Sequence, residues 1–271
     1  MNLEFSPTPQ MLQFAPKVNL NINAGRFVIR TIENYAELEQ AFLLRYQVFQ
    51  IEMIGQKNNQ GLDQDQYDIS ADHLAIFDSK TNQMIATCRL NCSLFSMNFY
   101  SEQEFHCSSL ISRPEVKLEI GRVCVHKDFR KGIIIMLLWR AIASYMMKTE
   151  TRLLFGCGSV MTESPTDAMV LYKYLIEENK VRTHLNISPT DKYRSQIFES
   201  LLLDNKNQLS HEQHLYAKEL LPSLCRSYFD IGCFTPGPPA FDHEFECIDF
   251  LTVLEIDQLD MRLRQKIGML S

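Results

Sequence analysis

One segment in the middle of the chain constrains the fold most, because it reads as a strand, a short basic turn and a helix. It runs from Val116 to Trp139 with the sequence VKLEIGRVCVHKDFRKGIIIMLLW. Its β-branched first part predicts a strand over about 117–125, and its apolar second part predicts a helix over about 132–148. Units of this kind can hold a phosphate group at the helix N-terminus. The turn, however, contains a single glycine, Gly132, where phosphate loops usually need two or three.

The other predicted elements favour an α/β (α+β) fold with a mixed central β-sheet flanked by helices. Strands are expected at about 26–32, 73–78, 84–91, 152–157 and 245–255, and helices at about 35–52, 164–180 and 212–231, with a last helix at the end of the chain. The strands on either side of the turn-forming segment 78–82 predict a hairpin. A mixed sheet with helices on both faces buries all the apolar faces.

The chain is expected to form one domain. Its 271 residues, 45% of them hydrophobic, can bury one large core, and ten glycines and ten prolines are too few for long linkers. We expect an irregular lead-in over residues 1–25 and a single domain over 26–271. Within that domain, residues 182–240 are expected to form a helical insertion or lid.

The chain has a negative net charge overall and a positive net charge in one region. A net charge of −6 argues against a nucleic-acid partner. From Arg113 to Arg152, however, nine cationic residues stand against four acidic ones, a local charge of +5. This region is either a solvated helix face or a docking patch for an anionic partner.

The cysteines and the termini indicate a cytoplasmic protein. The eight cysteines form no Cys-x-x-Cys pair, which favours reduced, buried thiols over disulfides or zinc ligands. The N-terminus has neither the basic nor the apolar region of a signal peptide. The longest apolar stretch, from Gly132 to Met147, contains Arg140 and is expected to be too short to span a bilayer. Peripheral contact with an inner membrane stays open.

An acidic cluster follows the first long helix. Asp63-Gln-Asp-Gln-Tyr-Asp68 is followed closely by Asp72-His73. Four carboxylates within ten residues repel one another unless a cation neutralises them. The cluster lacks the glycine and the distal glutamate of an EF-hand calcium loop. A solvated loop and a pocket for a cationic or amino-bearing substrate remain as alternatives.

A charged residue also lies beside the apolar face of the predicted helix at 35–52. Arg45 falls three residues after Phe42 and four before Phe49, which places it on or next to that face. A buried arginine needs an acidic partner, which the cluster at Asp63–Asp68 could supply. Alternatively, Arg45 lies at the surface with its stem along apolar neighbours.

Three more charged residues lie inside predicted strands. Arg89 lies within Ile85–Leu90, and Glu119 and Arg122 lie in the strand at about 117–125. The two-residue period of a strand places Glu119 and Arg122 on opposite faces unless a β-bulge intervenes, and Gly121 between them favours a bulge. Charges inside strands are usually paired or functional, so we infer a site.

These charged residues belong to patterns that occur together in one enzyme family. The patterns are Arg45-x-x-x-Phe49, Asp65-Gln-Tyr-Asp68, Cys88-Arg-Leu90 and Glu119-x-x-Arg122. In this order they resemble the acyl-homoserine lactone synthases, a branch of the GNAT acyltransferase fold that takes acyl chains from acyl carrier protein. The chain is still more similar to the ornithine N-acyltransferases of the ornithine-lipid (hemolysin-like) family, which are related to N-acyl amino acid synthases. The resemblance covers about residues 26–265 and continues through 72–74, 119–125, 137–139, 155–159, 221–224, 239–242 and 249–259.

The resemblance implies transfer of a fatty acyl group, 3-hydroxylated, from the phosphopantetheine thioester of acyl carrier protein to the α-amine of an amino acid such as ornithine. It implies no bound cofactor, and we assign no metal because His73 and His126 lack a ligand-spaced partner. Glu119 would accept the amine proton. Arg122 would act beside it, and Ser159 would protonate the leaving thiolate or place the acyl chain.

The remaining implied roles concern the two substrates. Asp65 or Asp68 would pair with the acceptor ammonium, and Arg89 or Arg122 would hold this network or the acceptor carboxylate. The acceptor-binding group as a whole is Arg45, Phe49, Asp65, Asp68, His73 and Arg89. The group implied for the acyl donor is Val123, Val125, Arg130, Lys131 and Gly132. Each of these side chains could instead be structural support.

Two rival functions stay open on the same sequence. The first is a CoA-dependent N-acetyltransferase, but Ile133 and Ile135 occupy the glycine positions at which such a turn binds pyrophosphate, so close backbone approach is hindered. The second is a non-enzymatic, membrane-active protein, which the absence of a signal, a span and a strongly amphipathic cationic helix disfavours. Cys157 could act as a nucleophile, but the simpler interpretation is that it is a small side chain buried in the core.

Overall fold

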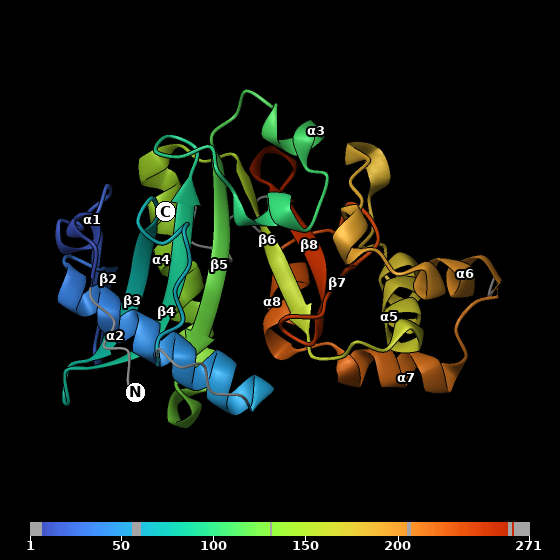
Figure 1. The fold of residues 1–271 in the computed structure, drawn as a ribbon, viewed down its shortest axis with the longest axis horizontal. Helices are drawn as coiled ribbons and strands as arrows, with labels where there is room; N and C mark the ends of the chain where they lie inside the picture. The colour runs from blue at the N-terminus through green and yellow to red at the C-terminus, as the bar shows by residue number, and fades with distance from the viewer. Residues whose placement is uncertain (1–6, 56–60, 131, 205–206, 260–261, 263–271) are drawn as a thin grey trace. The chain divides into compact units, whose positions relative to one another are not determined.

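The computed structural model describes residues 7–55, 61–130, 132–204, 207–259 and 262 (Figure 1). The chain divides into two compact units. The first takes in the described residues of Met1–Phe99 and Val116–Arg152, and the second consists of Tyr100–Glu115 and Leu153–Leu259. The expected single domain over 26–271 stays a prediction.

The first unit contains an antiparallel sheet whose strands pair in chain order. They are β1 (Asn21–Ala24), β2 (Phe27–Thr31), β3 (Asp72–Asp78), β4 (Gln83–Cys92) and β5 (Lys117–Val125). The predicted strands β2 to β5, including the hairpin of β3 and β4, are confirmed.

The N-terminal lead-in is more ordered than predicted. It contains the short helix α1 (Pro9–Leu12) and β1, which pairs with β2 around a two-residue turn. Gly25 in that turn has φ +63, the left-handed conformation that tight hairpins require and that glycine adopts without strain. Because β1 alternates Asn and small or apolar residues and is largely exposed, its sequence carries little strand signal.

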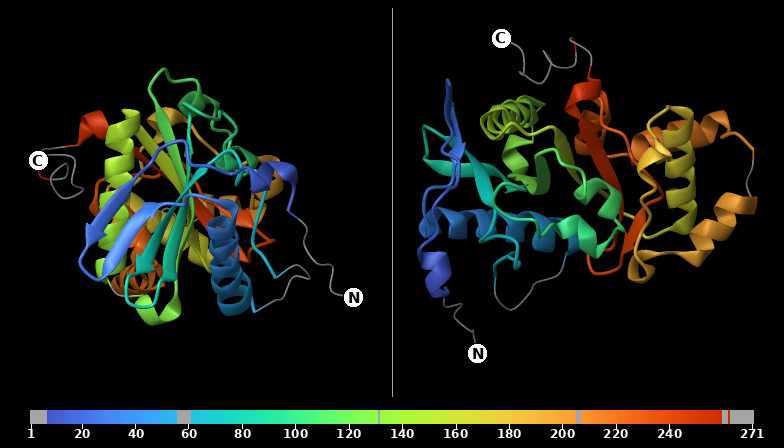
Figure 2. Two further views of the ribbon diagram at one scale, coloured as in Figure 1. Left: turned by 90° about the vertical axis from the view of Figure 1, so that its left-hand side faces the viewer. Right: turned by 90° about the horizontal axis from the view of Figure 1, so that it is seen from above.

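Two helices cover opposite faces of this sheet (Figure 2). Helix α2 (Tyr35–Arg45) continues as a π-helix (Tyr46–Ile54) and packs against β4 and β5, whereas α4 (Gly132–Thr149) packs against β2 and β3. The side chain of Asn34 caps α2 by accepting a hydrogen bond from the Glu37 N–H at 3.2 Å. Ala75 and Phe77 of β3 share a core with α2, and the opposite face of β3 contacts α4.

Strand β5 contains the expected bulge. Arg89 pairs with Gly121 and Thr87 pairs with Cys124, so two residues of β5, Arg122 and Val123, stand opposite one residue of β4. Arg122 adopts φ +51, which is uncommon for a residue other than glycine. The bulge therefore gives Arg122 a direction that regular alternation along the strand does not provide.

The length of helix α4 decides whether it could span a membrane. Its 18 residues extend beyond the predicted end, and within the described part of the chain it is the helix long and apolar enough to cross a membrane by length and composition. The expectation that this stretch is too short is therefore wrong. Half of the helix is buried, and core helices of this composition pass the same test, so the length alone is weak evidence of a span.

The second unit has its own antiparallel strands and most of the helices. Strand β8 (Cys247–Glu255) pairs with β6 (Leu153–Val160) on one side and with β7 (Ala240–Asp242) on the other. The helices are α3 (Ser108–Ile111), α5 (Pro165–Glu177), α6 (Gln196–Asp204), α7 (His211–Leu220) and α8 (Ser223–Asp230). A hydrophobic core joins α5, α6, α7 and α8 to β7 and β8.

The region 182–240 contains the helices α6, α7 and α8, and its expected role as an insertion or lid stays a prediction. The predicted helix at 212–231 is two helices, because Pro222 cannot continue α7 and instead precedes α8. Helix α6 and strand β7 were not expected. The predicted last helix lies outside the described residues except for residue 262, and so does most of the loop at 55–61.

Candidate active site

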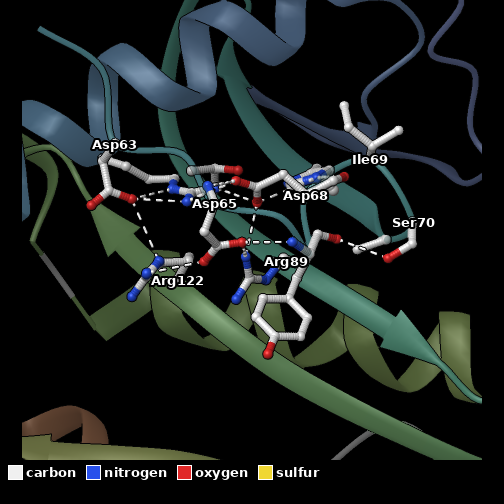
Figure 3. Close-up of polar contacts among 12 residues, drawn as sticks. Asp63, Asp65, Asp68, Ile69, Ser70, Arg89 and Arg122 are labelled. Atoms are coloured by element: carbon white, nitrogen blue, oxygen red, sulfur yellow. Dashed lines mark hydrogen bonds and ion pairs between the residues drawn. The ribbon is translucent and has the colours of Figure 1, made fainter. Parts of the chain in front are cut away.

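A buried network of ion pairs joins α2, the acidic loop and the strands β4 and β5 of the first unit (Figure 3). The guanidinium of Arg45, only 1% exposed, donates from Nε to Asp63 Oδ1 at 2.8 Å and from Nη1 to Asp68 Oδ1 at 2.7 Å. The prediction that Arg45 is buried against an acidic partner is confirmed, and the surface alternative is wrong.

The two strand arginines complete the network. Arg89 donates from Nη1 to Asp65 Oδ1 at 2.5 Å and to Asp68 Oδ1 at 3.0 Å. Arg122, directed by the bulge, donates from Nη2 to Asp65 Oδ2 at 3.0 Å and lies 3.4 Å from Asp63 Oδ1 through Nε. Three arginines thus face three aspartates, so their formal charges cancel. The three carboxylates are paired within the chain, and the cations that neutralise them are these three arginines.

The position of each carboxylate decides what it can do. Asp68 is fully buried and accepts from both Arg45 and Arg89. Burial alone would raise the pKa of Asp68, but Arg45 and Arg89 outweigh that effect and hold the pKa well below its usual value. Asp65 retains 19% exposure of its side chain. Asp68 is therefore an anchor of the network, and Asp65 is the aspartate with access to a ligand.

Asp72, the fourth carboxylate of the acidic segment, belongs to a different contact. It lies on the other face of β3, where it accepts from the Tyr145 hydroxyl of α4 at 2.8 Å and from the backbone N–H groups of Lys17 and Val18 at 2.8 and 3.1 Å. Asp72 therefore fixes the N-terminal segment and α4 and takes no part in the network.

His73 supports the network through a contact with the backbone of Asp68. Its Nε2 lies 2.9 Å from the backbone oxygen of Asp68, and its ring stands edge-on to Phe14 and Phe42. Burial lowers the pKa of His73 from 6.5 to about 4, and the attraction of Asp68 does not compensate for it. The imidazole is therefore neutral at pH 7, and it holds the loop at Asp68. Its expected contact with the acceptor stays a prediction.

The lowered pKa of His73 predicts an acid-sensitive fold. Below pH 6.5 the unfolded chain binds a proton at this histidine that the folded chain does not, so stability falls as the pH falls toward 4. The loss amounts to about 3 kcal/mol for this shift. Urea unfolding at pH 7 and pH 4 should show the His73→Gln variant losing less stability than the wild type by that amount. Equal losses in both proteins would contradict the role of His73.

Glu119 lies on the same face of the sheet as the network. It is 3% exposed and stands opposite Asn91, two residues along β4 from Arg89. Gly121, between Glu119 and the bulge, carries no side chain, and a Cβ there would lie 3.7 Å from Arg89 Nη2. The Arg89 guanidinium therefore lies over the backbone of β5 at Gly121.

The residues expected at the donor lie in the bulge and after it. Val123 and Val125 are half-buried, and the C-terminal part of β5 is less covered than its start. Arg130 donates from Nε to the backbone oxygen of Val125 at 3.0 Å and forms an ion pair with Glu52. Gly132 begins α4 and is exposed, whereas Lys131 lies outside the described residues. Phe49, expected at the acceptor, lies in the π-helix and packs beside the α2 core.

Ser159 belongs to the second unit and lies within β6, not after the strand as expected. Its side chain is exposed, and Oγ donates to Asp249 Oδ1 at 2.6 Å. A serine that already gives its proton to a carboxylate must break that hydrogen bond before it can protonate a thiolate. Its expected catalytic role stays a prediction.

A second acidic group was missed at the sequence level. Glu104 and Asp249 lie close to Cys157, the one cysteine that is not fully buried, whereas the other seven are buried thiols as expected. The sequence indicates this group only weakly. Glu104 is a charged residue next to the buried Phe105, but Glu104, Cys157 and Asp249 are far apart in sequence.

The bulged strand β5 is followed by a basic turn and the helix α4. The model of the acetyltransferase (GNAT) domain family matches residues 44–140, which include Arg45, the acidic loop, β3 to β5 and half of α4. The AHL synthase LasI shares the fold, with a TM-score of 0.50 and 11% identity over 91% of this chain and 96% of that one. The chain therefore contains a GNAT acetyltransferase domain and has the fold of an acyltransferase, as the resemblance implied.

The full-length relatives narrow the class further. An L-ornithine N(alpha)-acyltransferase of Rhizobium meliloti (strain 1021) is 28% identical over 247 residues, which cover 86% of this chain and 81% of that protein. The L-ornithine N(alpha)-acyltransferase of Rhodobacter capsulatus is 27% identical over 252 residues, 88% of this chain and 93% of that protein. The chain is a relative of the L-ornithine N(alpha)-acyltransferases, and the non-enzymatic alternative is wrong.

Proposed function

We propose that this enzyme transfers a fatty acyl group, 3-hydroxylated, from acyl carrier protein to the α-amine of ornithine. The observation that carries the proposal is the similarity to L-ornithine N(alpha)-acyltransferases along 86–88% of the chain. The network at β4 and β5 supports it, because an amino-acid acceptor needs both a cationic and an anionic contact.

The chemistry requires a neutral amine, a polarised thioester and a leaving thiolate. The amine nitrogen attacks the thioester carbon, the C–N bond forms, and the C–S bond breaks to release the pantetheine thiolate. The proton lost by the amine goes to Glu119, directly or through a water molecule, and finally to the thiolate. The buried position of Glu119, on the face of the sheet that carries Arg89, fits a carboxylate that is held in place for this transfer.

The exposure of the network residues divides their roles. Arg122 keeps 15% of its side chain exposed and Arg89 only 2%, so Arg122 is the arginine placed to bind the acceptor carboxylate. Asp65, the accessible aspartate, is the partner for the α-ammonium before deprotonation. Arg45, Asp68, Arg89 and His73 hold these two side chains in position.

The turn before α4 supports a carrier-protein donor. A carrier protein brings one phosphodiester, whereas CoA brings a pyrophosphate that needs several close backbone N–H groups. A Cβ at Gly132 would meet nothing within 4 Å, so the first turn of α4 is open to one phosphate. Ile133, half exposed, stands where a second glycine would be needed. Arg130 would exchange Glu52 for the phosphate, and the surrounding basic residues would dock the acidic carrier.

A thioester-release assay tests both substrates together. We expect thiol release from 3-hydroxyacyl carrier protein with ornithine, and little release from the matching acyl-CoA or from acetyl-CoA. Mass spectrometry of the product should place the acyl group on the α-nitrogen. Turnover with CoA donors alone would refute the carrier-protein donor and favour the N-acetyltransferase. Faster turnover with glycine than with ornithine would refute the acceptor.

A further inference from the structure

The second unit contains a buried acidic cluster that the proposed mechanism does not use. We define the cluster as Glu104, which follows the 3₁₀ turn Tyr100–Gln103, Cys157 of β6 and Asp249 of β8. One ligand atom from each of the three side chains lies within 4.8 Å of the other two. Glu104 is 0% exposed and Asp249 is 3% exposed, whereas Cys157 is partly exposed. All three residues belong to the same compact unit.

The backbone of the second unit holds the three side chains of the cluster in place. Ser159 pairs with Asp249 across β6 and β8, and Cys157 lies two residues before Ser159, so Cys157 and Asp249 share one face of the strand pair. The backbone oxygen of Glu104 accepts from the Thr190 N–H at 2.7 Å, which anchors the segment that carries the glutamate. The cluster is therefore built by strand pairing and backbone hydrogen bonds.

Glu104 has one carboxylate oxygen without a partner among the described residues. Its Oε2 accepts from Cys157 Sγ at 3.4 Å, but Oε1 is buried without a hydrogen bond. Within the described part of the chain, no lysine or arginine forms an ion pair with Glu104. The charged side chains that act on it are Asp249 and Asp242, which repel its negative charge. A buried carboxylate oxygen without a donor is costly, so the position favours a cation.

Asp249 is oriented by two neighbours that leave it able to bind a cation. Its Oδ1 accepts from Ser159 Oγ at 2.6 Å, and its Oδ2 accepts from Cys247 Sγ at 3.4 Å. Each oxygen of an ionised carboxylate offers about two lone pairs, so both contacts leave room for a metal. Hydrogen bonds of this kind fix the direction of carboxylates that bind metals.

We propose that Glu104, Cys157 and Asp249 bind one divalent transition-metal ion, which the chemistry of the ligands identifies as Zn²⁺. Carboxylate oxygens bind Zn²⁺ at about 2.0–2.2 Å and thiolate sulfur at about 2.3 Å, so ligand atoms in a tetrahedral site stand roughly 3.3–3.6 Å apart. The distance of 3.4 Å between Cys157 Sγ and Glu104 Oε2 matches this spacing. The other separations, within 4.8 Å, need side-chain shifts of at most about 1.5 Å.

The ligand types favour zinc over the commoner divalent ions. Mg²⁺ and Ca²⁺ prefer sites made of oxygen alone, whereas a thiolate beside two carboxylates suits Zn²⁺. Zn²⁺ takes the place of the thiol proton that Cys157 donates to Glu104, and that proton passes to the solvent. Three protein ligands leave a fourth position for water. The ion thus links the segment that follows Tyr100–Gln103 to β6 and β8.

Cobalt spectroscopy tests the thiolate ligand directly. Untagged full-length protein is titrated with Co²⁺, which gives a near-ultraviolet charge-transfer band when a thiolate binds it. We expect this band in the wild type, saturating at a single ion per chain and displaced by Zn²⁺. Cys157→Ala should abolish the band, and Glu104→Gln should weaken Co²⁺ binding by at least about tenfold, the cost of losing even an outer-sphere partner. The controls Cys233→Ala, a buried thiol, and Glu102→Gln, exposed beside Glu104, should titrate like the wild type.

Two further measurements on the wild type do not depend on the folding of any variant. Zn²⁺ should raise the Tm, and it should slow the alkylation of Cys157 by iodoacetamide, followed by mass spectrometry of the peptide that contains this cysteine. Mg²⁺ should do neither. Absence of the Co²⁺ band, alkylation of Cys157 that Zn²⁺ does not slow, or a band that Cys157→Ala retains would overturn the site. None of these measurements uses acyl transfer, so they are independent of the proposed function.

Discussion

Replacing Glu119 by glutamine is expected to lower kcat for acyl transfer by about 10²–10⁴-fold, the usual contribution of a general base. Glutamine keeps the shape of the buried side chain in β5 but cannot accept the proton of the attacking amine. The variant should therefore unfold at nearly the wild-type temperature while release of the thiol almost stops. Thiol release under single-turnover conditions separates the chemical step from product release.

The comparison of kcat with the Tm distinguishes a base from a structural residue. Glu119→Gln should lower kcat while the Tm and the KM for ornithine stay close to those of the wild type, whereas loss of a structural residue would lower the Tm. Glu150→Gln, exposed just after the end of α4, is the matched control and should behave as the wild type. Turnover of Glu119→Gln within threefold of the wild type would remove Glu119 from the mechanism.

The substitution Asp68→Asn is expected to destabilise the first unit by about 3–5 kcal/mol, because it leaves buried guanidinium groups without their charge partner. Asp68 accepts from Arg45 at 2.7 Å and from Arg89 at 3.0 Å, and all three side chains are at most 2% exposed. An asparagine amide supplies neither the charge nor two acceptor oxygens. Urea unfolding followed by circular dichroism measures the loss.

Two further variants make this test specific. Asp128→Asn removes an aspartate that is 71% exposed and 3.8 Å from His126, so its stability should stay within about 0.5 kcal/mol of that of the wild type. Asp65→Asn should cost less than Asp68→Asn because Asp65 is partly solvated. A loss for Asp68→Asn as small as that for Asp128→Asn would show that the network does not support the fold.

The sequence predicts the first unit well, because its elements have clear local periods. The turn segment between β3 and β4, the spacing of Phe42, Arg45 and Phe49 along the helical segment, and Gly121 in β5 each indicate a feature that the structure contains. The pairing of Arg45 with the acidic loop also follows from a general rule, since a buried arginine requires a carboxylate. The roles of these residues in catalysis remain predictions.

What the sequence does not predict depends on contacts between distant residues. Glu104, Cys157 and Asp249 meet only after the second unit folds, and no spacing along the chain indicates that they are neighbours. The sequence places Ser159 after its strand, whereas β6 continues through two glycines, which usually end strands. The neutralisation of the aspartates by Arg89 and Arg122 likewise depends on a loop folding back over two strands.

The bulge in β5 also sets the parity of the residues that follow it. Gly121 and Cys124 lie on the same face of the sheet although they are three positions apart, because one additional residue is accommodated between them. In a regular strand Cys124 would leave the core beneath α2, and Val123 and Val125 would turn toward it. Removing one residue at Arg122 would therefore move each side chain at the end of β5 to the opposite face of the sheet. It would also change the direction in which the chain enters the basic turn.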